Sequence, residues 1–151
     1  MSVGNLAARL STGEDWRVPL GEFLDGFYRL WPDLDAMAAA LAAPPDVALL
    51  PLPEALLAAT VEQLAAQWGV PCPAWAAKAG YGLVQPLSLG PAWMPPSRLP
   101  NPPGPFRKRL LHTDPDPLRR ARRPPLPPDQ HRRTADSAAS TAPGRSVRHR
   151  N

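Results

Sequence analysis

The clearest periodic pattern of apolar residues lies in the middle of the chain, over residues 53–68 (PEALLAATVEQLAAQW). Its apolar and small positions recur every three or four residues, the spacing of a helix with one buried face: Leu56, Leu57, Thr60, Val61, Leu64, Ala65 and Trp68. Glu54 falls in the first turn, where an acidic side chain favours the helix dipole. Gly69 and Val70 then predict a left-handed glycine that ends the helix and an apolar residue that folds back onto the last turn.

The same spacing predicts further helices on both sides of this one. Helices are expected in four stretches, residues 5–10, 16–31, 34–41 and 74–79, with apolar residues at helical intervals in the second and third of them. Pro32 ends the second of these stretches and can open the third. Residues 46–52 (DVALLPL) predict an extended segment, because the neighbouring prolines make a regular strand unfavourable.

Residues 68–75 (WGVPCPAW) resemble a motif more than any other stretch of the chain. A reactive Cys72 would need a histidine or acid to activate it, or further thiols to share a metal. Cys72 is the single cysteine, and all three histidines lie in the Pro- and Arg-rich part: His112, His131 and His149. We therefore interpret the stretch as a helix stop, a rigid corner and a helix start, with Trp68 and Trp75 flanking the corner.

Proline divides the chain into parts of different character. Fourteen of the 23 prolines fall between positions 86 and 128, where neither a helix nor a central strand can persist. We therefore predict an all-α fold, with a small bundle of three to four helices within residues 1–80. An irregular Pro-rich extension with a docked basic element follows over residues 81–121. Residues 122–151 are predicted to be a disordered basic tail, because they are low in complexity and nearly lack large apolar groups.

Charge is divided in the same way as proline. Residues 1–100 hold five basic and nine acidic side chains, a net charge of −4, whereas residues 101–151 hold twelve and four, a net charge of +8. Residues 105–123 (PFRKRLLHTDPDPLRRARR) interleave cations with apolar residues. This segment is either an arm that binds phosphates in a salt-dependent way or a solvated stretch whose apolar residues dock on the helices. The candidate nucleic-acid contacts are Arg107, Lys108, Arg109, Arg119, Arg120, Arg122 and Arg123.

Several function classes are disfavoured by what the sequence lacks. There is no Gly-rich phosphate loop, no nucleophile elbow and no pair of His or Cys residues at metal spacing. We therefore predict no catalytic residue, cofactor or metal, and a protein that is not an enzyme. The N-terminus lacks the features of a signal peptide, and the apolar stretch 36–66 is interrupted by acids and prolines. A lone cysteine fits a reducing compartment, so we expect a cytoplasmic protein without a membrane segment.

Three short elements, taken together, resemble a group of small helical bacterial proteins. Gly69-Val70-Pro71-Cys72-Pro73-Ala74-Trp75 is similar to the group's G-L-P-x-P-x-W signature, and Asp15-Trp16-Arg17 with Phe23-Leu24-Asp25 is similar to its D-W-R…FLD element. Pro105-Phe106-Arg107-Lys108-Arg109 and Leu118-Arg119-Arg120-Ala121 are similar to its P-x-F-R-x-R…L-x-R-A element. The match covers residues 5–121, although residues 82–103 depart from the group's L-x-x-P-W/F segment.

Members of that group look like companions of toxin–antitoxin genes. The resemblance implies that residues 106–109 are docked beside the helices. It also favours a non-enzymatic regulatory or interaction module, possibly an antitoxin or accessory protein with a toxin or regulator as its partner. The candidate contact surface consists of aromatic groups that a small core cannot fully cover: Trp31, Trp68, Trp75 and Trp93. The alternative is nucleic-acid binding through residues 107–123.

Overall fold

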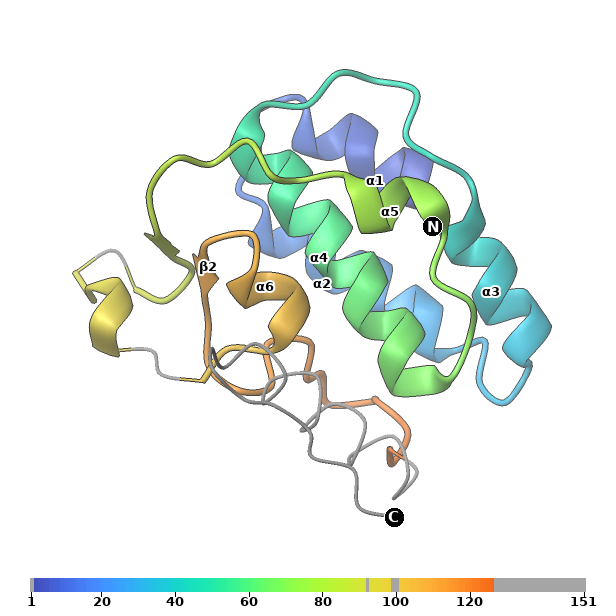
Figure 1. The fold of residues 1–151 in the computed structure, drawn as a ribbon. Helices are drawn as coiled ribbons and strands as arrows, with labels where there is room; N and C mark the ends of the chain where they lie inside the picture. Colours follow the sequence, from blue (N-terminus) through green and yellow to red (C-terminus); the bar gives the residue numbers. More distant parts are fainter. Residues whose placement is uncertain (1, 92, 99–100, 127–151) are drawn as a thin grey trace, which may run out of the picture.

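The computed structural model describes residues 2–91, 93–98 and 101–126 (Figure 1). The described residues are mostly helical, as predicted, but they also form a two-stranded parallel sheet. Six α-helices occur among them: α1 (Val3–Leu10), α2 (Arg17–Tyr28), α3 (Leu34–Ala42), α4 (Pro51–Trp68), α5 (Ala74–Lys78) and α6 (Gly104–Arg107). The other elements are β1 (Leu87–Ser88), the 3-10 helix η1 (Pro96–Arg98) and β2 (Leu111–His112). The predicted bundle of three to four helices is not confirmed.

Helix α4 is the central element of the fold. It packs against α1, α3, α5 and α6, and Figure 1 shows these helices arranged around it. The sequence predicted one buried stripe, whereas almost all of α4 from Ala55 onward is buried, because small residues such as Ala58 and Ala59 let neighbours approach from several sides. The helix also begins at Pro51, so the predicted extended segment 46–52 is wrong at its last two positions. A proline in the first turn removes only an N–H that has no helical partner.

The corner after α4 is confirmed. Gly69 adopts the left-handed conformation (φ 69°), and Val70, which is buried, donates its N–H to the carbonyl of Ala65 at 3.1 Å. Helix α5 then starts after Pro73. The two flanking tryptophans have different surroundings: Trp68 lies in the core, and the Trp75 indole donates a hydrogen bond to the carbonyl of Ala42, the last residue of α3, at 3.2 Å. Helices α4 and α5 pack against each other across the corner, and both lie against α3.

Residues 101–126, called the returning segment below, lie against the preceding helices and complete the core. Helix α6 packs on α4, and Phe106, Leu111 and Leu118 are each at most 1% exposed. Strand β2 pairs in parallel with β1 in the register Leu87↔Leu111. This strand pair departs from the all-α prediction, because pairing between segments more than twenty residues apart leaves no periodic pattern in short Pro-rich sequences. The predicted disordered tail lies outside the described residues from position 127 onward.

Replacing Phe106 by alanine tests whether the returning segment contributes to the core. Phe106 belongs to α6, which packs on α4, and only 1% of its surface is exposed. Phe106→Ala is therefore expected to lower the free energy of unfolding by about 3–5 kcal/mol. Urea denaturation followed by circular dichroism measures the change. Val84→Ala is the control, since Val84 is 90% exposed and its truncation should change stability by no more than about 0.5 kcal/mol. Equal effects of the two substitutions would contradict the docking of α6.

Candidate functional site

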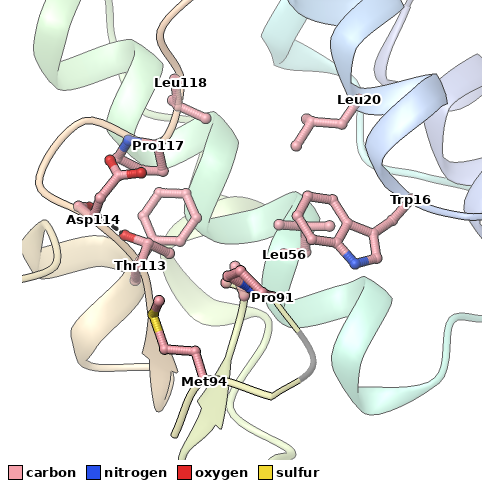
Figure 2. A pocket seen from close by; sticks show the side chains of 12 residues that line it. Trp16, Leu20, Leu56, Pro91, Met94, Thr113, Asp114, Pro117 and Leu118 are labelled. Carbon is pink, nitrogen blue, oxygen red and sulfur yellow. Dashed lines mark hydrogen bonds between the residues drawn. The ribbon is translucent and has the colours of Figure 1, made fainter. Parts of the chain in front are cut away.

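The first candidate site is a cavity of about 200 Å³ (Figure 2). It lies between the start of α2, helix α4 and the returning segment. Trp16 and Leu20 form one side, and Thr113, Pro117 and Leu118 form the opposite side. Further lining residues come from α4, from residues 89–94 and from α6: Leu56, Leu89, Gly90, Pro91, Met94 and Phe106. Four chain segments that are distant in sequence therefore meet at this cavity.

The cavity is lined mainly by apolar side chains, and its Thr113 hydroxyl and one oxygen of Asp114 are hydrogen-bonded to the backbone. The Thr113 hydroxyl donates to the carbonyl of Asp114 at 2.6 Å, and the Asp114 carboxylate accepts the N–H of Asp116 at 2.8 Å. Figure 2 shows the Asp114 side chain at the edge of the cavity, beside Thr113 and Pro117. An apolar cavity of about 150 Å³ is large enough for benzene. This cavity can therefore take one apolar side chain of the size of leucine, methionine or phenylalanine.

The structure does not bring the four predicted tryptophans together on one surface. Trp68 is buried, and Trp31 covers it with a ring-centroid distance of 5.1 Å. Trp75 is half-buried against α3. Trp93 is 73% exposed and directly precedes Met94, a lining residue of the cavity, in the sequence. Trp93 is therefore the most exposed member of the predicted set.

Arg109, one of the predicted nucleic-acid contacts, is buried in the core. Its guanidinium donates to three backbone carbonyls, those of Ala76 (2.6 Å), Ala79 (2.9 Å) and Pro105 (2.8 Å). It also forms an ion pair with Glu62 of α4, at 2.9 Å between Nη2 and Oε1. With 1% of its surface exposed, the Arg109 side chain cannot reach a phosphate in this fold. Its role is to hold α5, α6 and α4 together.

The remaining candidate nucleic-acid contacts differ in their ion pairs and in their exposure to solvent. Lys108 pairs with Glu62 (2.6 Å), and Arg120 and Arg123 form two-bond pairs with Asp25 and Asp116, respectively. Arg107 is half-buried in α6. Arg119 and Arg122 are exposed, and both border a hollow over the end of α2. That hollow also includes Arg29, which the sequence analysis missed because it is isolated from other cations along the chain.

Cys72 borders an open hollow that is also lined by Glu62, Val70 and Pro71. Burial raises the pKa of the Cys72 thiol, and the nearby Glu62 carboxylate raises it further, whereas Arg109 and Lys108 act in the opposite direction with smaller effects. A raised pKa keeps the thiol protonated at neutral pH and lowers its nucleophilicity. The described residues contain no group of three His, Cys, Asp or Glu side chains placed to hold a metal ion.

Comparisons with known proteins identify no relative of this chain. No protein-family model matches the sequence, and neither the curated proteins nor the solved structures contain a significant match. The resemblance to the toxin–antitoxin companions therefore stays a prediction. Within the described part of the chain, none of the helices combines the length and the apolar character needed to cross a membrane.

The raised pKa of Cys72 predicts slow alkylation. At pH 7 the thiol is expected to react with iodoacetamide more slowly than free cysteine, because less of it is thiolate. Glu62→Gln should speed the reaction, since it removes the carboxylate that raises the pKa. Mass spectrometry of timed samples measures both rates, and Asp35→Asn on α3 is the charge-matched control. Alkylation of the unaltered protein faster than free cysteine would contradict the structural interpretation of Cys72.

Proposed function

We propose that the protein is a non-enzymatic interaction module that binds a partner protein by receiving one of its apolar side chains. The observation that carries the proposal is the apolar cavity of about 200 Å³ between Trp16, Leu56 and Leu118. Anchor side chains that enter well-packed apolar pockets contribute much of the binding energy in protein interfaces. The cavity has the size and the chemistry for such an anchor.

The surroundings of the cavity also favour a protein partner. Trp93, which directly precedes the lining residue Met94 in the sequence, presents a largely exposed indole, and tryptophan is enriched among residues that dominate binding energy. Met94 lines the cavity and has the flexible, polarizable side chain that adapts to different apolar partners. Arg17 lies over the Trp16 ring at 4.5 Å and pairs with Asp15. An apolar centre with a charged rim is the usual composition of a protein interface.

The class of partner comes from the sequence resemblance rather than from the geometry. The proposal is that the partner is a toxin or a regulator encoded near this protein in a bacterial genome, with this chain acting as an antitoxin or accessory protein in the cytoplasm. The similarity of Asp15-Trp16-Arg17 to the group's D-W-R element supports this, because Trp16 and Arg17 lie at the cavity and its rim. Two residues of the D-W-R element, Trp16 and Arg17, therefore belong to the proposed interface.

Selection of peptides from a displayed random library on the full-length chain tests the proposal. We expect the enriched peptides to share one large apolar residue, which is the anchor that enters the cavity. Trp93→Ala should weaken binding of a synthetic selected peptide by about 30-fold if Trp93 contributes about 2 kcal/mol. Isothermal titration calorimetry measures the dissociation constants, with Val84→Ala as the control for an exposed apolar residue.

A second variant tests the cavity itself rather than its rim. Leu89 is half-buried in the cavity wall, so Leu89→Trp is expected to fill the cavity and abolish peptide binding while the helical circular dichroism is unchanged. Unchanged affinity in Leu89→Trp and Trp93→Ala would refute the cavity as the binding site. Failure of any peptide with an apolar anchor to be enriched would also count against the proposal.

A further inference from the structure

A hollow of about 420 Å³, separate from the apolar cavity, lies where the returning segment crosses α2. Four arginines border it together with Asp25 and Ala121: Arg29, Arg119, Arg120 and Arg122. Three of these cations come from one stretch of the returning segment, and Arg29 comes from the end of α2. The fold therefore brings together arginines that are about ninety residues apart in the sequence.

Arg120 has a structural role in this hollow. Its guanidinium donates two hydrogen bonds to the Asp25 carboxylate, at 2.9 and 2.8 Å. It also lies directly on Gly21, where a Cβ atom would come within 3.0 Å of Nη1. The Arg120 guanidinium holds the pKa of Asp25 below its usual range, so the pair stays ionised at neutral pH. Arg120 therefore fixes the returning segment on α2 and neutralises the single acid in the hollow.

The other three arginines are exposed to solvent. The guanidinium groups of Arg29, Arg119 and Arg122 form no hydrogen bond or close ion pair with any residue that the structure describes. Arg29 and Arg122 nevertheless act on Asp25 and lower its pKa by smaller amounts than Arg120 does. Like charges that share one hollow repel each other, and an anion that enters the hollow removes this repulsion. Guanidinium groups are suited to phosphate because their planar donors match two phosphate oxygens at once.

We propose that Arg29, Arg119 and Arg122 form a binding site for the phosphodiester backbone of nucleic acid. An extended polyanion is favoured over a single phosphate because the sequence after the hollow remains basic. Residues 127–151 contain two acids, Asp129 and Asp136, and five further arginines: Arg132, Arg133, Arg145, Arg148 and Arg150. Each further contact between such a cation and a phosphate would release counterions and add to the affinity.

Fluorescence anisotropy with a fluorescein-labelled 20-nucleotide DNA, as single strand and as duplex, tests the site on the full-length chain. The dissociation constant is measured between 50 and 300 mM NaCl, and the slope of its logarithm against log salt counts the phosphate contacts. Arg29→Gln is expected to reduce the slope by about 1 and Arg119→Gln/Arg122→Gln by about 2. Arg98→Gln, an exposed arginine of η1, is the charge-matched control and should leave the slope unchanged.

Arg29→Gln is the decisive variant because it leaves the basic segment after residue 104 intact. If only that segment binds DNA, Arg29→Gln will behave like Arg98→Gln, and the proposed site is overturned. Absence of DNA binding by the unaltered protein at 50 mM NaCl also overturns it. Tripolyphosphate is the competitor: displacement of DNA at an equal concentration of phosphate groups would assign the hollow to small polyphosphates instead. Thermal melts of each variant confirm that it is folded.

Discussion

The arrangement of the described chain depends on the buried guanidinium of Arg109. An isolated charge in a protein interior costs several kcal/mol, and this cost is offset only when hydrogen bonds and an opposite charge surround it. Here the carbonyls at the end of α5, the carbonyl of Pro105 and the Glu62 carboxylate supply both. Gly80 (φ 87°) makes room, because a Cβ atom there would lie 2.9 Å from the Arg109 Nε. The returning segment is thereby fastened to the helices that precede it.

Both candidate sites follow from this attachment. Thr113, Asp114, Pro117 and Leu118 form one wall of the apolar cavity, and the residues directly after them, Arg119–Arg122, border the arginine hollow. Between the two, the Tyr28 hydroxyl donates to the carbonyl of Leu118 at 2.6 Å and ties the segment to α2. Burial raises the pKa of Tyr28, so the phenol keeps the proton that this bond requires. A fold without the docked segment would lack both surfaces.

The helical part of the fold could be predicted from the sequence because its signals are local. The apolar spacing around Leu56 and Leu64 and the glycine at position 69 define α4 and its end without reference to the rest of the chain. The position of the returning segment on the helices could not be predicted from local signals, since Pro-rich residues carry no periodic pattern. Nothing local distinguishes the buried Arg109 from the exposed Arg119, because the difference arises from carbonyls supplied about thirty residues earlier. The cavity and the role of Arg29 likewise required the tertiary structure.

Native-state hydrogen exchange tests the central claim most directly, because it reports the stability of the docked segment amide by amide. The N–H groups of Lys108 and Leu110 are hydrogen-bonded to carbonyls within the segment. If Arg109 holds the segment as part of the core, these amides will exchange with the same opening free energy as those in the middle of α4, and Arg109→Leu will abolish their protection. Exchange of Lys108 and Leu110 at the rate of an unstructured peptide in the unaltered protein would contradict the account.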